Sequence, residues 1–371
     1  MIGEKQIPIV SVIVPILNEE KYISSFLESL EQQDYAAENM EIFLVDGQST
    51  DRTRSLIEDF QASSILNITL IDNPDKIQSS AMNLGIKHSV GKYIIRLDAH
   101  TIYESNYIRS CVELLDTRDV ANVGFYLVTR GKGKVGGSIA KALSSPFGVG
   151  SSQFRISREE IDTDTVPFGA FRRDIFQEVG LFNEYLACNE DNDINSRIRS
   201  KGYKILLSNK SFASYFCRDT LTSLGKMAIR NGKWNVYSLY YSHQSMSIKY
   251  FIPFFFVAAL VGSALLSTVF PFMGMMFALV LLSYMSVNSY FSSKLADNGA
   301  EFFRLLMIFF TFHFCYGVGS MIGIVGYIEK VIRKQPKFKA LEIIGGGVKY
   351  LDRFYSILPI SGLVIRNEVV I

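Results

Sequence analysis

VSVIVPILNE, residues 10–19, is a short β-branched run that ends in two polar side chains. A helical pattern of apolar residues follows it, at Ile23, Phe26, Leu27 and Leu30. A buried strand followed directly by an amphipathic helix is typical of the first unit of an α/β sheet. The run is apolar enough for a signal peptide, but no small-residue cleavage site follows it, so a buried strand is the better interpretation.

The same alternation of strand and helix repeats along the next eighty residues. Strands are predicted at 41–45, 68–71 and 93–97, with helices ending near residue 60 and covering 77–88. Four strand–helix units with short connections predict a mostly parallel sheet covered by helices. Ligands of such sheets bind outside the carboxyl ends of the strands.

Polar side chains stand at each of these strand ends. They are Asn18-Glu19, Asp46, Asp72-Asn73 and Asp98-Ala99-His100. One acidic strand end is common, because Asp starts turns and caps helices. Four in succession indicate a site for a cation or for ribose and base donors. Asp98 and His100 suit Mn²⁺ or Mg²⁺ with diphosphate oxygens completing the shell, although His100 alone is also compatible with an ordinary surface histidine.

Charge and cysteine content exclude several classes of protein. The 38 basic and 36 acidic side chains leave a net charge of +2, which does not favour nucleic-acid binding. The four cysteines occur singly, so neither a disulfide scaffold nor a paired-cysteine zinc site is expected. The mean hydropathy of +0.18 is high for a soluble protein and low for a mostly membrane-embedded one, which indicates two unlike regions.

The hydrophobic residues are concentrated after Lys249. No Asp, Glu, Lys or Arg occurs in the 44 residues 250–293, nor in the 24 residues 305–328. Since about 20 apolar residues cross a bilayer, the first stretch predicts two spans, divided near Pro271, and the second predicts one. Core helices of a soluble domain are the less favoured alternative at these lengths.

These features predict four regions: an α/β domain at 1–219, an amphipathic membrane-surface helix within 220–249, two to three spans at 250–328, and a basic tail at 329–371. The N-terminal domain is expected in the cytoplasm, beside the inner cell membrane. Seven basic and two acidic residues between Lys330 and Arg353 would place the tail there too. Three complete spans would put the tail on the opposite side. Either one segment is re-entrant or the positive-inside rule fails here, and the sequence does not decide between the two.

Five ordered motifs resemble those of the family 2 glycosyltransferases, which are inverting, nucleotide-sugar-dependent enzymes of the GT-A fold. They occupy residues 8–235, and Asp98-Ala99-His100 stands where the family has Asp-x-Asp. The other four are 10–19, 45–53, the block 167–173 with Asn189-Glu190-Asp191-Asn192-Asp193, and 230–234, a degenerate Gln-x-x-Arg-Trp element. Together with 165–171 and 313–319, the Asp-Ala-His variant resembles the succinoglycan-type exopolysaccharide glucosyltransferases.

The resemblance implies a role for each candidate residue. Pro15, Asn18, Glu19, Asp46 and Asp98 would bind the nucleotide sugar. A divalent ion on Asp98 and His100 would act as a Lewis acid on the departing diphosphate. Asp191 would be the catalytic base that takes the proton of the acceptor hydroxyl.

The acceptor side is expected around Glu190 and the helix that follows. Arg230, Lys233 and Trp234 would grip the diphosphate and the acceptor sugar, and Trp234 is equally compatible with an aromatic anchor beside the membrane. The alternative interpretation of Glu190 and Asp191 is that they are ordinary acidic residues in the first turn of a helix, without a catalytic role.

The segment 131–136 spells Gly-Lys-Gly-Lys-Val-Gly, the spacing of a dinucleotide fingerprint. No acidic strand end follows about 20 residues on, so a mobile loop over the acceptor site is the favoured interpretation.

The sequence therefore predicts a membrane-anchored transferase that moves a hexose, glucose from UDP-glucose, to a polyprenyl-linked saccharide. The alternatives are a processive polysaccharide synthase, which would need more spans to form a pore, and an inactive nucleotide-sugar-binding scaffold, which would have lost Asp98 or Asp191. A transporter is disfavoured because the apolar segments contain no charged residue to bind a coupling ion.

Overall fold

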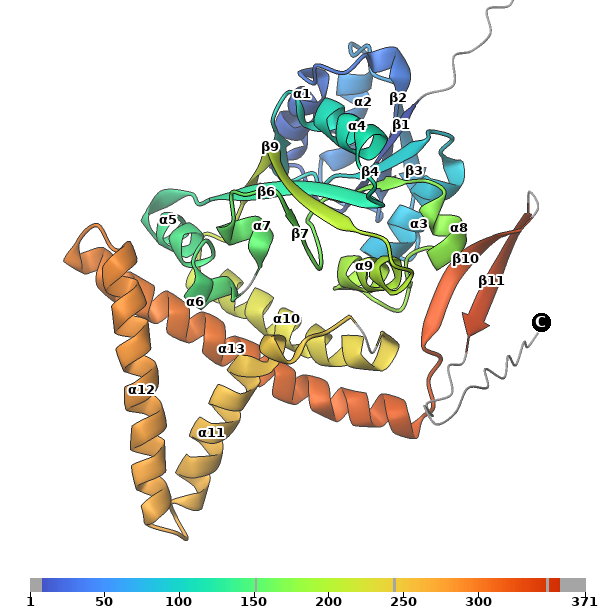
Figure 1. Cartoon of the computed structure of the whole chain (residues 1–371). Coiled ribbons are helices and arrows are strands. Elements are labelled where there is room, and N and C mark those ends of the chain that lie inside the picture. Colours follow the sequence, from blue (N-terminus) through green and yellow to red (C-terminus); the bar gives the residue numbers. More distant parts are fainter. Residues whose placement is uncertain (1–8, 151, 243–244, 345–346, 354–371) are drawn as a thin grey trace, which may run out of the picture.

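The computed structural model describes residues 9–150, 152–242, 245–344 and 347–353, and within them the chain forms an α/β unit followed by long apolar helices (Figure 1). In the described part of the chain the α/β unit is built on a nine-stranded sheet of order β3-β2-β1-β4-β8-β6-β9-β5, with β7 paired to β9. The strands are β1 Val10–Ile16, β2 Met40–Asp46, β3 Ile68–Asp72, β4 Tyr93–Arg96, β5 Thr101–Tyr103, β6 Asn122–Arg130, β7 Ile161–Asp162, β8 Ala170–Arg172 and β9 Ile205–Phe216.

The first half of the sheet is parallel, as predicted. β1 pairs with β2 and β4, and β2 with β3, all in parallel register. Helices on both faces bury these strands, which explains why β1 and β2 are almost continuously apolar. The covering helices are α1 Ile23–Glu31, α2 Thr53–Gln61, α3 Gln78–His88 and α4 Tyr107–Thr117.

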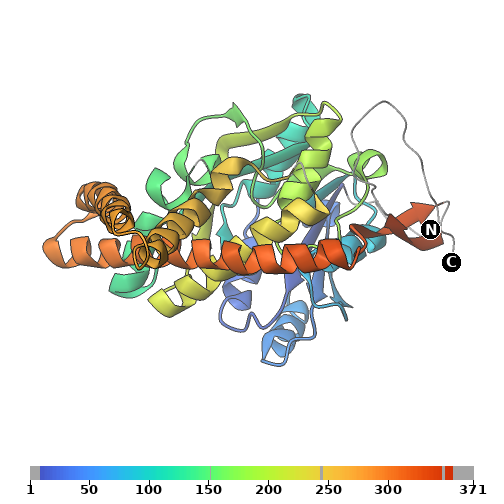
Figure 2. The same ribbon diagram turned by 90° about the horizontal axis from the view of Figure 1, so that it is seen from below.

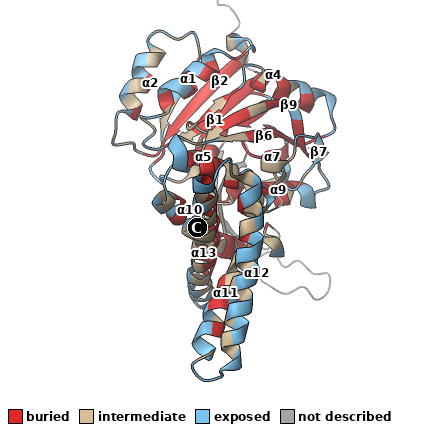
Figure 3. Ribbon diagram, turned by 90° about the vertical axis from the view of Figure 1, so that its left-hand side faces the viewer, coloured by how far each residue is buried: buried red, intermediate tan, exposed pale blue. Residues whose placement is uncertain are grey.

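The second half of the sheet is mixed. β8 is antiparallel to both β4 and β6, whereas β9 runs parallel to β6 and antiparallel to β5. The helices between β6 and β9 include α6 Pro146–Val149, α7 Gln153–Ile156, α8 Ile175–Val179 and α9 Glu190–Ser200. A short 3-10 helix, η1 Ala37–Asn39, precedes β2. Figure 3 shows the buried strands enclosed within this unit.

The prediction of a mobile loop at 131–136 is wrong. Helix α5, Gly133–Ala142, begins inside this segment, and its N-terminal turn folds back on the residue that precedes it. A Cβ atom at Gly131 would lie 1.9 Å from the carbonyl oxygen of Gly136. The glycines therefore serve a close backbone contact at the start of a helix.

The C-terminal region is helical, and its elements begin and end close to the predicted positions. α10 covers Leu221–Tyr241, the segment predicted as amphipathic, and Pro271 separates α11 from α12 as expected. Three helices of the described chain, Ile248–Leu266, Phe272–Leu295 and Gly299–Ile332, are long and apolar enough to cross a membrane. The elements are η2 Ile248–Phe251, α11 Ile252–Leu266, α12 Phe272–Leu295, α13 Gly299–Ile332, β10 Phe338–Ile344 and β11 Gly347–Arg353.

The three apolar helices differ in how they pack against the α/β unit. α11 and α12 form a hairpin that projects from the body, whereas α13 runs along the base of the α/β unit beside α10 (Figures 1 and 2). The predicted boundary between spans and tail at residue 328 falls inside α13, and residues 354–371 of the predicted tail lie outside the described residues.

Candidate active site

Two turns at the strand ends hold each other in place. Asn18 has a left-handed backbone (φ 56°), its N–H donates to Ser49 Oγ at 2.8 Å, and its side-chain oxygen accepts from Thr50 N–H at 2.8 Å. Glu19 N–H donates to Thr53 Oγ1 at 2.8 Å. The two segments that resemble donor-binding motifs are therefore one hydrogen-bonded unit, because adjacent parallel strands bring their carboxyl ends together.

Asp46 lies at the end of β2 and is fully buried. Its carboxylate accepts from Ser49 Oγ at 2.6 Å and pairs with Arg54 Nη1 at 2.7 Å, and the same nitrogen lies 2.6 Å from Asp72. Four of the five predicted donor ligands, Pro15, Asn18, Glu19 and Asp46, lie at this edge without lining the cavity described next. Their role in nucleotide binding stays a prediction.

A cavity of about 610 Å³ opens beside these turns, between the sheet, α9 and α10. It brings together five predicted site residues: Asp98, His100, Glu190, Asp191 and Arg230. Lys233 and Trp234 lie one turn further along α10 and do not line it. The face of α10 that does is formed by Ser223, Lys226, Met227, Arg230 and Asn231.

Arg96, at the end of β4, joins the two walls of the cavity. Its guanidinium lies 3.1 Å from Glu190 Oε1 and 3.7 Å from Asp98 Oδ1, and only 10% of its side chain is exposed. Burial raises the pKa of Glu190 to about 7; Arg96 opposes this shift, and Asp191 adds to it. One arginine thus holds the carboxylate of Asp98, just after β4, and that of Glu190, at the start of α9.

The three acidic residues at the start of α9 have different surroundings. Glu190 is engaged by Arg96, and Asp193 by Arg197 Nη2 at 2.8 Å. Asp191 lines the cavity, and within the described residues it has no ion-pair partner; its Oδ1 accepts only from Asn192 N–H, at 2.8 Å. The carboxylate best placed to accept a proton from a substrate is therefore that of Asp191.

Asn189 anchors the beginning of α9 to α10. It adopts a left-handed backbone (φ 64°), and its side-chain amide donates to Asn235 Oδ1 at 2.9 Å and Ser238 Oγ at 3.0 Å. Arg230 Nη2 donates to the carbonyl oxygen of Ala187 at 3.0 Å. The position of Asp191 therefore depends on α10, more than 30 residues later in the chain.

His100 has the surroundings of a metal-binding histidine. Its Nδ1 lies 3.3 Å from Glu19 Oε1, and no hydrogen bond reaches its Nε2 from the described residues. A carboxylate on the far ring nitrogen is the usual support of a histidine that ligates through the other. Burial lowers the pKa of His100, but Glu19 and Asp98 outweigh that effect and raise it overall.

Asp98 and His100 together fit a divalent ion whose shell is completed by substrate. In the described chain no three His, Cys, Asp or Glu side chains converge into a complete protein metal site. Mg²⁺-type ions are commonly held by one or two protein ligands plus diphosphate oxygens, which this pair can accommodate.

Several cavity residues were missed by the sequence reasoning. Arg96 had a signal, a charged residue inside the apolar strand Tyr-Ile-Ile-Arg, but Arg155 and Arg218 stand in no recognisable motif. Arg155 is oriented by Thr129 Oγ1, 3.1 Å from its Nη1, and lies over the ring of Tyr215. With Lys226 and Arg230 they give the cavity the positive charge that a diphosphate needs.

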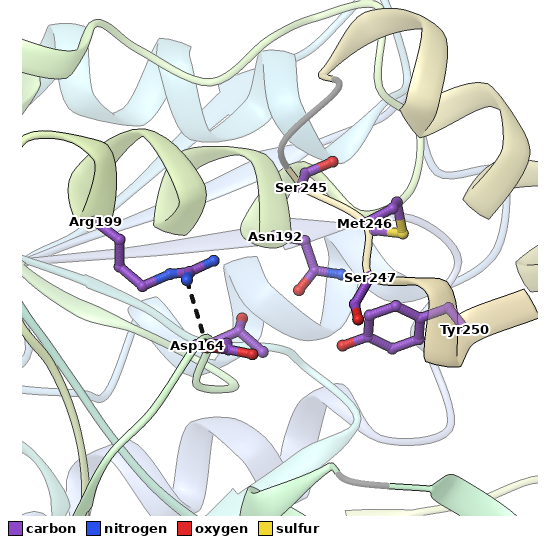
Figure 4. A pocket seen from close by; sticks show the side chains of 8 residues that line it. Asp164, Asn192, Arg199, Ser245, Met246, Ser247 and Tyr250 are labelled. Atoms are coloured by element: carbon purple, nitrogen blue, oxygen red, sulfur yellow. Dashed lines mark hydrogen bonds and ion pairs between the residues drawn. The ribbon is translucent and has the colours of Figure 1, made fainter.

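A second, smaller cavity of about 190 Å³ lies on the other side of Asn192 (Figure 4). It is lined by polar groups of α9 and of the segment that leads into α11, with Arg199 paired to Asp164 at 3.4 Å. The lining residues are Asp164, Thr165, Asn192, Arg199, Ser245, Met246, Ser247 and Tyr250.

Comparison with known proteins identifies this arrangement. The profile described as "Glycosyl transferase family 2" matches residues 11–180. A dolichyl N-acetyl-α-D-glucosaminyl phosphate 3-β-D-2,3-diacetamido-2,3-dideoxy-β-D-glucuronosyltransferase of Methanococcus voltae is 30% identical over 230 residues, 60% of this chain and 71% of that protein. The succinoglycan biosynthesis protein ExoA of Rhizobium meliloti is 28% identical over 215 residues, 57% of this chain and 64% of ExoA.

The fold also has a solved counterpart. The mannosyltransferase PcManGT of Pyrobaculum calidifontis, solved in complex with GDP-Man and Mn²⁺, superposes with a TM-score of 0.54 at 18% sequence identity, covering 85% of this chain and 88% of that one. This likeness confirms the predicted GT-A architecture. With its family motifs in order and its polar strand ends gathered at one cavity, the chain belongs to glycosyltransferase family 2.

Proposed function

We propose that this glycosyltransferase moves a hexose from a nucleoside diphosphate sugar to a lipid-linked saccharide, with inversion at the anomeric carbon. The observation that carries the proposal is the shared cavity. Asp98 and His100 lie on its donor wall and the unpaired carboxylate of Asp191 on its acceptor wall. An inverting displacement needs these two functions on opposite faces of one sugar.

The donor proposed is UDP-glucose. Four cations, Arg155, Arg218, Lys226 and Arg230, line the cavity together with Asp98, which suits a diphosphate. The fold relative PcManGT was solved with GDP-Man and Mn²⁺, which supports a nucleoside diphosphate sugar and Mn²⁺ or Mg²⁺ here. The similarity to ExoA, a succinoglycan biosynthesis protein, favours exopolysaccharide or other surface-glycan synthesis. Glucose is proposed from the motif resemblance to the succinoglycan-type glucosyltransferases.

In this mechanism Asp191 accepts the proton of the acceptor hydroxyl as that oxygen attacks the anomeric carbon. A divalent ion on Asp98 and His100 would supply the charge that neutralises the departing diphosphate. Arg96 holds Glu190 and Asp98 at a fixed separation, so it positions the two walls without touching the reacting atoms. Glu19 orients the ring of His100.

The acceptor proposed is a polyprenyl-linked saccharide. The M. voltae relative is named for a dolichyl-phosphate-linked substrate. In this chain the second cavity offers hydroxyl and amide groups from Asn192, Ser245 and Ser247 next to the first apolar helix, a suitable surface for a sugar that arrives from the membrane (Figure 4). The enzyme would then work at the inner cell membrane, with its α/β domain in the cytoplasm.

The test measures nucleoside diphosphate release. Membranes containing the full chain are incubated with a panel of nucleotide sugars and Mn²⁺ or Mg²⁺, with and without added lipid extract. UDP-glucose is expected to give the fastest release, and lipid extract is expected to increase it. Membranes containing Asp191→Asn serve as the matched control, since that variant keeps the donor site.

Each outcome decides between functions. If no donor releases its nucleotide, the proposed transferase activity is wrong, and the protein would instead be a scaffold that binds nucleotide sugars. A ladder of lengthening products would show a processive synthase, whereas addition of a single sugar supports the proposal.

A further inference from the structure

Helix α13 contacts the catalytic domain at both of its ends. At its beginning, Glu301 accepts from Lys141 Nζ at 2.9 Å and from Ser138 Oγ at 3.1 Å, both on α5. Just beyond its end, the carbonyl oxygen of Lys337 accepts from Asn183 Nδ2 at 2.9 Å, and Phe338 packs against a core cluster of the α/β domain. The 34 residues of α13 extend about 50 Å, more than a bilayer core is thick.

Between its ends α13 lies in backbone contact with α10. A Cβ atom at Gly319 would lie 2.2 Å from the carbonyl oxygen of Ile229, and one at Gly323 would lie 2.8 Å from that of Lys233. Ser320 Oγ donates to the carbonyl oxygen of Gly232 at 3.3 Å. Glycines at these positions let the two helices approach closely along their length (Figure 2).

A helix held in this way cannot have its ends on opposite sides of a membrane. Both ends touch one α/β domain whose strands and loops contain many charged groups, and that domain stays in water. The outer face of α13 is nevertheless apolar and exposed, at Phe303, Met307, Ile322, Val325, Ile328 and Ile332. Such a face fits the boundary between headgroups and acyl chains, where an in-plane helix buries one side.

The α11–α12 hairpin has the opposite character. It projects away from the body with most of its surface exposed (Figures 1 and 3). Large apolar side chains at its tip, including Val269, Phe270 and Phe272, are exposed. No charged residue occurs between residues 250 and 293, the tip included.

The turn at this tip satisfies its own hydrogen-bond donors. The backbone N–H groups of Ser267, Thr268, Val269 and Phe270 donate to carbonyl oxygens of α11, and the next residue, Pro271, has no N–H. The hydroxyls of Ser267 and Thr268 also donate to carbonyl oxygens of α11, at 2.6 and 2.7 Å. Since unsatisfied polar groups are costly in hydrocarbon, a turn whose donors are bonded in this way is compatible with a position in the lipid.

We infer that the α11–α12 hairpin enters the bilayer and returns with its tip still in the lipid, while α13 lies in the membrane plane, so that the chain after α13 shares a side with the catalytic domain. Among the described elements, only the hairpin then penetrates the membrane. This arrangement also removes the conflict over the basic residues after Lys330, which come to lie on the cytoplasmic side as the positive-inside rule requires. It does not depend on which sugar is transferred.

The test uses the full chain in sealed vesicles of phosphatidylcholine and phosphatidylglycerol, with one added cysteine per variant. Lys87→Cys, exposed on α3, reports which way the catalytic domain faces. Lys334→Cys reports the chain after α13, and Val269→Cys reports the tip. A membrane-impermeant maleimide is added before and after detergent, and the labelling of the parent chain, with its four native cysteines, is subtracted.

Lys334→Cys is expected to react from outside to the same fraction as Lys87→Cys, and Val269→Cys only after detergent. In vesicles whose two orientations are unequally populated, an outside-reactive fraction of Lys334→Cys that equals the protected fraction of Lys87→Cys would mean that α13 crosses the membrane, and the inference would be wrong. Reaction of Val269→Cys from the face opposite the catalytic domain would equally overturn it. Arg333→Cys and Phe272→Cys replace any variant whose thermal unfolding midpoint differs from that of the parent chain.

The depth of a fluorescent label in the bilayer provides an independent measurement of the topology. A bimane label at Val325→Cys, on the outer face of α13, should be quenched most by lipids brominated near the headgroup. The same label at Val269→Cys should be quenched most by lipids brominated deep in the acyl chain. Strongest quenching of the Val325 label by the deep bromines would place α13 across the bilayer and contradict the inference.

Discussion

The two walls of the active-site cavity are built in different ways. The donor wall consists of strand ends and the turns that follow them, and its contacts join motifs such as Asn18 with Ser49 and Thr50. The acceptor wall consists of the first turn of α9, which is held by side chains of α10, and α10 in turn lies against α13. The donor wall is thus determined by strand register, and the acceptor wall by the packing of α9, α10 and α13.

This difference has a functional consequence. In the proposed function, a soluble nucleotide sugar would be recognised by groups at the sheet edge, whereas Asp191, the proposed base, is positioned by α10. Arg96 joins the two walls directly, through Asp98 and Glu190. Substitutions on either side should therefore give separable effects.

The largest effect is expected from Asp191→Asn. Loss of a general base lowers the transfer rate by a factor of about 10²–10⁴, while donor binding is unchanged because the donor wall is intact. Transfer rate and nucleotide-sugar binding are measured on the same preparation. Asp59→Asn, on an exposed part of α2, is the control and should transfer normally. Normal turnover by Asp191→Asn would remove it as the base.

Arg96→Met tests the connection between the walls. It leaves Glu190 and Asp98 without their shared cation, and breaking such a buried pair costs about 3–5 kcal/mol of stability. Burial raises the pKa of Glu190 to about 7 even though Arg96 lowers it, so loss of Arg96 raises it further and makes ionisation above pH 7 more costly. The loss of stability should therefore grow as the pH rises through 7.

Denaturant unfolding at pH 6 and pH 8 measures that loss. The double variant Arg96→Met, Glu190→Gln removes the uncompensated charge and should recover part of the stability at pH 8. No recovery would show that Arg96 stabilises the fold through contacts other than Glu190.

The donor wall is tested through its metal requirement. Glu19→Gln weakens the support of His100 and should raise the Mn²⁺ concentration needed for half-maximal activity about 10–100-fold. His100→Ala, which removes the ligand itself, should raise it at least as much. His88→Ala, on the exposed end of α3, is the matched control. An unchanged Mn²⁺ requirement in His100→Ala would show that this histidine is not a ligand.

The smallest effect is expected where α10 meets α13. Gly319→Ala places a methyl group against the carbonyl oxygen of Ile229, and such overpacking costs about 1–3 kcal/mol. Gly262→Ala, on α11, has no neighbour within 4 Å and should cause no loss. Thermal unfolding in detergent compares the two. Equal midpoints would show that the helix contact does not contribute to stability.

Much of this protein follows from local pattern. The four parallel strands, the amphipathic α10, the break at Pro271 and the cluster of acidic residues at the start of α9 all appear in the structure where the sequence predicts them. The motif-based resemblance to family 2 is confirmed by the relatives. Each of these rests on residues that are close in the chain, where hydrophobic periodicity and turn chemistry act directly.

The prediction that was wrong and the cavity residues that were missed depend on contacts between residues far apart in the chain. The segment at 131–136 became a helix start because Gly131 and Gly136 meet closely. Arg155 and Arg218 reach the cavity because α7 packs against β6 and β9 pairs with β6, so no motif marks them. Lys233 and Trp234 lie outside the cavity because it ends one helical turn before them.

The sequence by itself determined the family, the sheet and the apolar character of the C-terminal helices, because periodicity and strand-end motifs are local properties. Only the tertiary structure decided which carboxylate of α9 is unpaired, how Arg96 joins the two walls, and that α13 lies against the catalytic domain at both ends. Hydropathy counts apolar residues without showing which surface covers them. A helix that packs along a domain and one that crosses a membrane therefore look alike until their neighbours are known.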